Sequence, residues 1–140
     1  FTRKASQGRF ATMAVAMVGP DGETLEYASA GHPPSLLRRT RTGEVVRLDA
    51  PSGPVLGPVP DARFADASVT VERGDVLLMY TDGLVERRGL DIDEGISRAA
   101  QMVADWGPDA RLNDMCGQLP ELLAPRPRAD DVCLLAVRFR

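Results

Sequence analysis

Apolar residues gather in short runs separated by turn signals, and these runs predict the strands at the start of the chain. Phe10–Val18 is almost continuously apolar, which is typical of a strand buried on both faces. Gly19-Pro20-Asp21-Gly22 is a turn signal. In Thr24–Ala30, residues Leu25, Tyr27 and Ser29 alternate with Glu26 and Ala28, as the side chains on the two faces of a strand do. The two runs are predicted to form an antiparallel hairpin.

A second hairpin is predicted after Pro33-Pro34, because prolines remove backbone donors and favour extended or turn geometry. Its strands are Ser35–Arg39 and Glu44–Leu48, with the turn at Thr42-Gly43. The next stretch, Asp49–Arg63, is rich in glycine and proline and predicts a long loop. Loops of this length inside a compact domain are usually functional or mobile.

Three further runs predict the remaining strands. Ala67–Glu72 and Val76–Tyr80 are joined by Arg73-Gly74-Asp75. Val76–Tyr80 is apolar throughout, which favours a central position in a sheet. The last strand is predicted at Val132–Phe139, which is also mostly apolar.

Two helices are predicted before that last strand. Apolar residues recur at helical spacing at Ile92, Ile96, Ala100 and Val103. Asp91 is the predicted N-terminal cap of this helix, and Gly107-Pro108 ends it. A second apolar stripe between Leu112 and Leu119 predicts another helix, which Pro120 kinks or stops.

The order of these elements predicts the fold class. Six or seven strands in hairpin order, then two helices and a strand, favour an α+β fold with an antiparallel sheet. The chain has 140 residues, of which 44% are apolar, and this is enough for one packed core. We therefore predict a single domain over residues 1–140.

Composition then narrows the function classes. The net charge is −3, whereas nucleic-acid-binding domains normally carry a basic excess. No apolar run approaches the ~20 residues that a membrane span needs, and no signal-peptide pattern opens the sequence. Cys116 and Cys133 lie in separate apolar segments and are predicted to be buried reduced thiols, which points to a cytoplasmic protein.

Two acidic segments adjoin strands that are predicted to be buried. Asp82 follows Val76–Tyr80, and Gly83 leaves room for a sharp turn and for a ligand or ion. Asp130 and Asp131 precede the last strand, where adjacent carboxylates repel each other and a divalent cation relieves the repulsion. If the two strands are neighbours, these carboxylates converge at one end of the sheet. Oxygen-only ligands favour Mg²⁺ or Mn²⁺, and two such ions can activate water against a phosphoryl group.

Each of these features also has an ordinary structural interpretation. Thr81-Asp82-Gly83 after a strand is often a simple turn, and Asp130-Asp131 before a strand is often a solvated turn. His32, the only histidine, either contacts a phosphate or orients a site group, or else locks a turn by hydrogen bonding. Three arginines of the second hairpin either attract a phosphorylated partner or form a solvated face; they are Arg38, Arg39 and Arg41.

Five blocks of sequence carry a family resemblance. They are Arg9–Thr12 (RFAT), Tyr27–Pro34 (YASAGHPP), Gly53–Gly57 (GPVLG), Gly74–Glu86 (GDVLLMYTDGLVE) and Asp130–Leu135 (DDVCLL). In this order they resemble bacterial SpoIIE/RsbU-type phosphatases. These belong to the metal-dependent, type 2C-like (PPM) serine/threonine protein phosphatases.

The resemblance implies a sandwich of two antiparallel sheets flanked by helices (the αββα phosphatase fold), with two Mg²⁺ or Mn²⁺ ions between the sheets. It implies that Asp82 and Asp130 hold metal and carry catalysis, with Asp131 as the substitute for Asp130. Gly83 would lie beside the ion, and Glu86 would be an accessory acidic group. The implied reaction is attack of metal-activated water on phosphoserine or phosphothreonine of a partner protein, such as an anti-sigma-factor antagonist.

Two departures from the family pattern stand out. The usual Asp-Asp-x-Thr reads Asp130-Asp131-Val132-Cys133 and loses a hydroxyl beside the site. The family's earlier Asp-centred metal motif is not found before Phe10, so the chain is predicted to be the C-terminal part of a domain that lacks its N-terminal portion. Exposed edges of the incomplete sheet would then invite pairing with another chain, and hence a homo-oligomer.

Three hypotheses follow from the sequence. The first is a fragment of a metal-dependent protein phosphatase, inactive by itself if the absent part is required. The second is a non-catalytic partner-binding or sensory module with a degenerate phosphatase fold. The third is an unrelated small metal-binding domain that uses Asp82 and Asp130.

Overall fold

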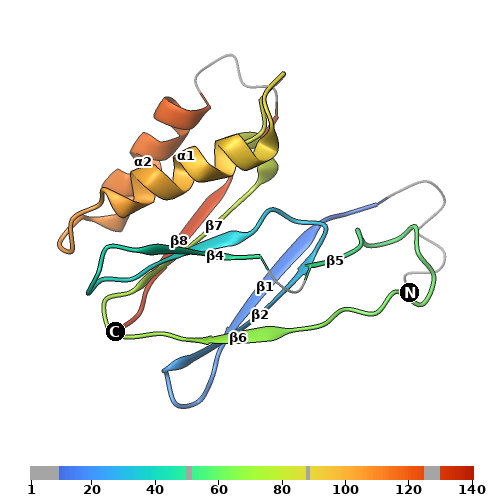
Figure 1. Ribbon diagram of the computed structural model, residues 1–140, viewed down its shortest axis with the longest axis horizontal. Coiled ribbons are helices and arrows are strands. Elements are labelled where there is room, and N and C mark those ends of the chain that lie inside the picture. The colour runs from blue at the N-terminus through green and yellow to red at the C-terminus, as the bar shows by residue number, and fades with distance from the viewer. Residues whose placement is uncertain (1–9, 50–51, 88, 125–129) are drawn as a thin grey trace. The chain divides into compact units, whose positions relative to one another are not determined.

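The computed structural model describes residues 10–49, 52–87, 89–124 and 130–140 (Figure 1). The chain divides into two compact units. The first comprises Phe1–Pro34 and Leu48–Val71, and the second comprises Ser35–Arg47 and Glu72–Arg140. The prediction of a single domain over residues 1–140 stays a prediction, and each unit is described by itself.

The first unit is a sheet built around strand β2 (Thr24–Ala30). β2 pairs antiparallel with β1 (Met13–Val18), in a register that runs from Met13↔Ala30 to Val18↔Leu25. On its other side it pairs antiparallel with β6 (Ala67–Thr70) and, over two residues, parallel with β5 (Ser52–Gly53). The predicted first hairpin is confirmed.

Strand β1 corrects the prediction that Phe10–Val18 is buried on both faces. Among the described residues its one strand partner is β2. Met13, Val15 and Met17 are 47%, 49% and 58% exposed. An apolar run indicates that burial would be favourable, but side chains are buried on both faces only where other elements cover both faces of the sheet.

The second unit holds the other sheet and the helices. Its strands are β3 (Ser35–Arg38), β4 (Val45–Leu48, of which Leu48 is assigned to the first unit), β7 (Val76–Tyr80) and β8 (Leu134–Arg138), in the order β4-β3-β7-β8. β7 pairs antiparallel with both β3 and β8, which confirms its predicted central position. β6 and β7 are consecutive in the chain but lie in different sheets, so the predicted run of hairpins is interrupted there.

The helical segments of this unit are η2 (Asp82–Leu84, a 3-10 helix), α1 (Ile92–Ala104) and α2 (Leu112–Leu123). Asp91 caps α1 as predicted, since its carboxylate accepts a hydrogen bond from the Asp93 backbone N–H at 3.0 Å. Pro120 does not stop α2, which continues for three more residues. None of the helices in the described part of the chain is long and apolar enough to cross a bilayer.

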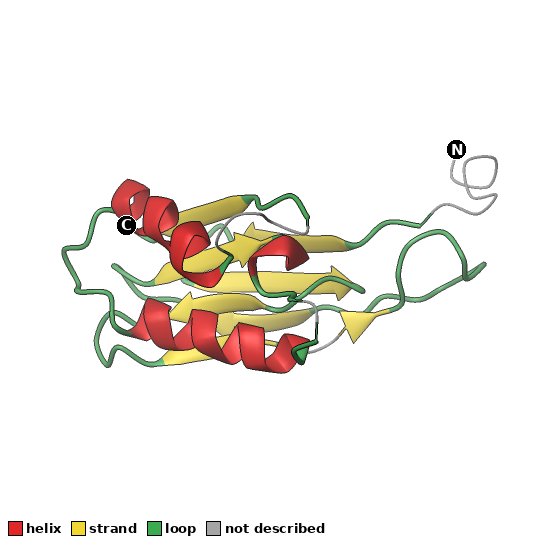
Figure 2. Cartoon of the chain, turned by 90° about the horizontal axis from the view of Figure 1, so that it is seen from above, coloured by secondary structure: helices red, strands yellow, loops and turns green. Residues whose placement is uncertain are grey.

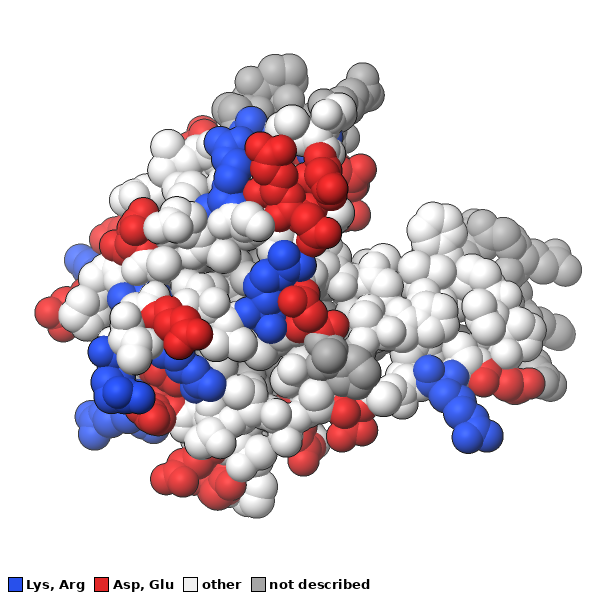
Figure 3. All heavy atoms as spheres, in the orientation of Figure 1, with Lys and Arg blue, Asp and Glu red and all other residues white. Residues whose placement is uncertain are grey.

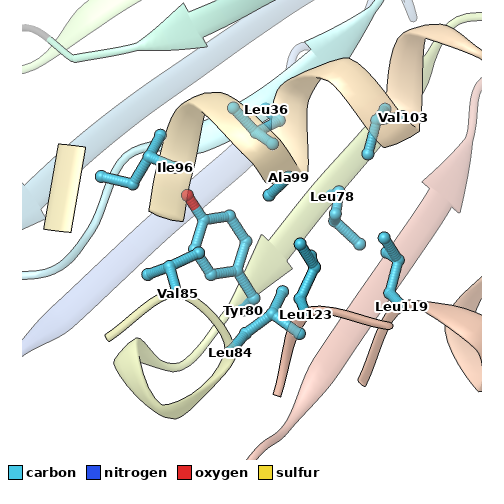
Figure 4. Close-up of a cluster of buried hydrophobic side chains, with 10 residues drawn as sticks. All are labelled: Leu36, Leu78, Tyr80, Leu84, Val85, Ile96, Ala99, Val103, Leu119 and Leu123. Carbon is cyan, nitrogen blue, oxygen red and sulfur yellow. The ribbon is translucent and has the colours of Figure 1, made fainter. Parts of the chain in front are cut away.

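The core of the second unit lies between the sheet and the two helices, which cover the same face (Figures 1 and 2). Leu36 and Leu78 are cross-strand partners on this face, and both are fully buried. Figure 4 shows side chains from the strands, η2 and both helices pointing toward one another. The buried cluster is Leu36, Leu78, Tyr80, Leu84, Val85, Ile96, Ala99, Val103, Leu119 and Leu123. Ile92 was predicted to belong to the α1 stripe, but its side chain is 38% exposed.

Candidate metal centre

Asp82 lies where the central strand leaves the sheet. Thr81 is still extended, and the chain then turns at once into η2. The Val85 and Glu86 backbone N–H groups both donate to the Asp82 carbonyl, at 2.9 and 2.7 Å. Because Leu84 and Val85 are buried in the helical core, the turn that carries Asp82 is anchored on a packed surface.

The segment before β8 runs beside this turn. β7 and β8 are antiparallel with Tyr80 opposite Leu134, so the end of one strand meets the beginning of the other. The Thr81 backbone N–H donates to the Cys133 carbonyl at 3.1 Å. The Thr81 hydroxyl donates to the Asp131 carbonyl at 2.9 Å and accepts from the Cys133 N–H at 2.9 Å. The prediction that these two strands are neighbours in the sheet is therefore confirmed.

Gly83 makes the closest approach between the two acidic segments. A Cβ at this position would lie 2.5 Å from the Asp131 carbonyl oxygen and 3.2 Å from the Asp130 carbonyl carbon. Real Cβ atoms do not approach other atoms so closely. Gly83 was predicted to leave space for a ligand or ion. In the direction of a Cβ atom, that space is occupied by the backbone of Asp130 and Asp131.

The donor chemistry of this edge fits a hard divalent cation, because Asp82, Asp130 and Asp131 all offer carboxylate oxygens. Asp82 is half-buried, whereas Asp130 and Asp131 are exposed. The Asp131 N–H donates to the Asp130 carboxylate at 2.7 Å. Among the described residues no three His, Cys, Asp or Glu side chains gather closely enough to hold a metal, so these aspartates fit as part of a ligand set. The assignment of Asp82, Gly83, Asp130, Asp131 and Glu86 to a metal centre stays a prediction.

His32 belongs to the first unit, where its contacts fit a turn that is locked by hydrogen bonds. Its Nδ1 lies 2.9 Å from the Thr12 hydroxyl. Its backbone N–H donates to the Ser29 hydroxyl, which donates in turn to the His32 carbonyl. Gly31 has φ +62°, and a Cβ there would lie 2.4 Å from Val55. A role for His32 at the metal centre stays a prediction.

The arginines of the second hairpin differ from the predicted solvated face. Arg38 is buried, and its guanidinium donates to the Trp106 carbonyl. Arg39 forms an ion pair with Asp75 at 2.9 Å, and only Arg41 is strongly exposed. Charged side chains of both signs are interspersed over the face seen in Figure 3.

Asp75 is a buried carboxylate that the sequence analysis did not single out. It accepts hydrogen bonds from Arg39 Nη1 and from the backbone N–H groups of Thr40 and Glu72, at 2.9, 2.9 and 3.1 Å. It therefore ties the turn before β7 to the β3–β4 hairpin. The one signal in the sequence was its place in the Gly74-Asp75 turn before an apolar strand.

The cysteines are free, as predicted, but the prediction that both are buried is wrong. Cys133 is exposed, and Cys116 is half-buried. Burial raises the pKa of the Cys116 thiol, which disfavours the reactive thiolate there. A separate pocket beside η2 is lined by residues that include Leu84, Arg87, Leu90 and Glu94. It contains neither Asp82 nor the Asp130-Asp131 pair, so it is distinct from the acidic edge.

Comparison with known proteins agrees with the resemblance. The family described as "Stage II sporulation protein E (SpoIIE)" matches residues 1–140. The phosphoserine phosphatase RsbU of Bacillus subtilis (strain 168) is 33% identical over 79 residues, which are 56% of this chain and 23% of the relative. The chain spans less than a quarter of the length of the curated relatives that it matches.

Solved structures show the same fold. The RsbU and RsbW domains of a Mycobacterium tuberculosis protein match with a TM-score of 0.77 and 31% identity, over 92% of this chain and 37% of that chain. The phosphatase domain of SpoIIE from Bacillus subtilis, presoaked with Mn, matches with a TM-score of 0.63 and 17% identity. That match covers 91% of this chain and 56% of the SpoIIE chain. The predicted α+β class with antiparallel sheets and two helices is confirmed.

Proposed function

Because this chain belongs to the SpoIIE family of PP2C-type protein phosphatases, we propose that it contributes Asp82 and Asp130 to a metal-dependent phosphatase site. The substrate class would be phosphoserine or phosphothreonine of a partner protein, such as an anti-sigma-factor antagonist in the cytoplasm. The name of the relative RsbU, a phosphoserine phosphatase, supports this class.

One observation carries the proposal, namely the three hydrogen bonds that join Thr81 to residues 131–133. They place Asp82 next to the segment that bears Asp130 and Asp131. Divalent Mg²⁺ or Mn²⁺, when bound, polarises a phosphoryl oxygen and lowers the pKa of bound water. A relative that was solved after presoaking with Mn supports this choice of metal.

The residues of the chain have separate tasks in this proposal. Asp82 and Asp130 hold the cation, and Asp131 replaces Asp130 if the Asp130 carboxylate remains bonded to the Asp131 N–H. Gly83 admits the Asp131 backbone, and Glu86, one turn beyond Asp82, adds negative charge at the same end of the sheet. The anchored η2 turn keeps the Asp82 carboxylate in place while substrate binds.

A non-catalytic, partner-binding module is the second candidate. It is favoured by the fact that, in the described part of the chain, fewer than three metal-ligating side chains gather at one point. Cys133, which stands where the resemblance expects a threonine, points the same way. This alternative predicts partner binding that is indifferent to chelators.

Hydrolysis of a generic aryl phosphate in the presence of Mn²⁺ tests the proposal. We expect activity that a chelator abolishes, and that Asp82→Asn and Asp130→Asn each reduce by at least about 100-fold. Asp105→Asn is the matched control, because Asp105 is an exposed carboxylate at the end of α1. Activity that survives chelation contradicts the proposal, and activity retained by either variant removes that residue from the site.

A further inference from the structure

We propose that Thr81 is a positioning residue for the metal centre, whose hydroxyl fixes the distance between Asp82 and the Asp130-Asp131 segment and thereby sets metal affinity. This inference rests on the proposed function. It assigns no metal contact to Thr81 itself. The hydroxyl acts through the backbone on either side of the site.

The hydroxyl acts both as a donor and as an acceptor toward one segment. It donates to the Asp131 carbonyl and accepts from the Cys133 N–H, both at 2.9 Å. These two groups flank Val132, so the side chain spans the connection between Asp131 and β8. With the bond from the Thr81 backbone N–H to the Cys133 carbonyl, three hydrogen bonds join Thr81 to residues 131–133.

These bonds lie just beyond the end of the regular β7–β8 ladder. The last paired residues of the ladder are Tyr80 and Leu134. Without the hydroxyl, the bond from the Thr81 N–H to the Cys133 carbonyl would be the one that remains of these three hydrogen bonds between the described segments. The side chain of Thr81 therefore extends the pairing to the position where the carboxylates begin.

These three hydrogen bonds, which we call the Thr81 clamp, oppose an electrostatic repulsion between the two segments. Asp82, Asp130 and Asp131 are expected to repel one another without metal, and the segment that bears the last two is exposed. A ligand set is effective when its supporting groups hold it in the productive geometry before the ion arrives. Gly83 removes the steric obstacle to close approach, and Thr81 supplies the attraction.

The sequence of the last block gives this clamp a further meaning. The resemblance led us to expect a hydroxyl-bearing residue where Cys133 stands. In the structure the hydroxyl of Thr81, a residue of the Gly74–Glu86 block, accepts a hydrogen bond from the Cys133 backbone N–H, which leaves the Cys133 side chain out of this contact. Replacing the Cys133 side chain should therefore matter little, whereas replacing the Thr81 hydroxyl should matter.

Metal affinity, measured without any turnover, tests the proposal. The Mn²⁺ dissociation constant is obtained from the electron paramagnetic resonance signal of free Mn²⁺ for the wild type, Thr81→Val, Thr81→Ser and Cys133→Ser. We expect Thr81→Val to weaken Mn²⁺ binding about 10–100-fold, as loss of a supporting group outside the ligands typically does. Thr81→Ser, which keeps the hydroxyl, and Cys133→Ser should stay within about 3-fold of the wild type on the same reasoning.

The outcomes separate this proposal from the proposed function. If Thr81→Val binds Mn²⁺ as the wild type does while Asp82→Asn does not, the metal site stands and the role of Thr81 is overturned. If Thr81→Ser loses as much affinity as Thr81→Val, the hydroxyl is not the cause and the role is likewise overturned. If wild type and Asp82→Asn bind alike, both proposals fail. Thr81→Ala makes the same comparison should valine prevent folding.

Discussion

Two apolar runs of this chain read alike in the sequence and end in opposite environments. β7 lies between two strands and under two helices, and Val76, Leu77, Leu78 and Tyr80 are all at most 4% exposed. β1 has one strand partner among the described residues, and its large side chains are about half exposed. Apolar composition therefore reports what a strand would gain from burial, whereas its neighbours decide whether burial occurs.

The two units also differ in how rigidly they hold their candidate functional side chains. The buried strand β7 ends at Tyr80, and Asp82 begins the turn that follows, which is packed against the helices. The first unit offers His32, which lies in the turn after β2 and is hydrogen-bonded to the hydroxyl of Thr12, 20 residues earlier in the chain. A carboxylate on a rigid support is the better starting point for a metal centre.

The largest predicted effect compares one residue from each strand. Leu78→Ala should destabilise the protein by about 2–5 kcal/mol, because it opens a cavity in the core. Met17→Ala on β1 should cost less than about 1 kcal/mol, because folding buries less than half of the Met17 side chain and the substitution therefore loses little buried apolar area. Urea unfolding of both variants measures the two values. Similar losses would mean that β1 is buried in the protein in solution.

The next comparison uses two helical glycines. A Cβ on Gly95 would lie 2.0 Å from the Val85 carbonyl oxygen, so Gly95→Ala should cost about 1–3 kcal/mol or more. A Cβ on Gly117 in α2 would meet nothing within 4 Å, so Gly117→Ala should stabilise by about 0.5–1 kcal/mol. Thermal unfolding of the pair decides this. A neutral Gly95→Ala would show that α1 does not pack against the turn after Asp82 as described.

Removal of the buried carboxylate in the second unit should have an intermediate effect. Asp75→Asn weakens the ion pair with Arg39 and should cost about 1–3 kcal/mol. Glu72→Gln is the control, because its 4.0 Å pair with Arg41 is exposed and should be worth less than about 0.5 kcal/mol. Chemical denaturation of the two variants makes the comparison. Equal effects would mean that the Asp75 network is solvated.

The smallest predicted effect lies in the turn between β1 and β2. The hydrogen bond from the Thr24 hydroxyl, followed by those from the Glu23 and Thr24 N–H groups, lowers the pKa of Asp21 below its usual value of 3.8. Since the folded state then binds this proton less tightly than the unfolded state, the stabilisation is complete above that value. It is lost as the pH falls through the lowered pKa.

Titration of the Asp21 carboxyl carbon by NMR checks this direction. In Thr24→Val, which lacks the largest cause, the pKa of Asp21 should move back toward 3.8. An unchanged pKa would assign the shift to the backbone bonds alone.

The sequence predicted best what depends on local pattern. The bounds of Thr24–Ala30 and Val76–Tyr80, the Asp91 cap and the core position of Ile96 all follow from neighbours a few residues away. The exposure of β1 could not be predicted in this way, because it depends on what covers the faces of its sheet.

The same limit applies to the candidate site. The sequence identified Asp82 and Asp130-Asp131 as chemically notable, and the pairing of β7 with β8 was the condition for their convergence. It missed the contribution of Thr81, because a hydroxyl that bonds to a backbone some 50 residues away becomes visible only once the register of the two strands is known. It missed Asp75 for the same reason, since two of the Asp75 partners, Arg39 and Thr40, lie on another hairpin.

The central claim is that the turn after β7 and the segment before β8 form one cation site. Addition of substoichiometric Mn²⁺ to the ¹⁵N-labelled protein tests it most directly, because a bound paramagnetic ion broadens the amide signals around it. We expect the amides of Asp82, Gly83, Asp130 and Asp131 to broaden together, and that of Gly22, beside the exposed Asp21, to remain sharp. Broadening of only one of the two segments, or of the Gly22 turn first, would contradict the account.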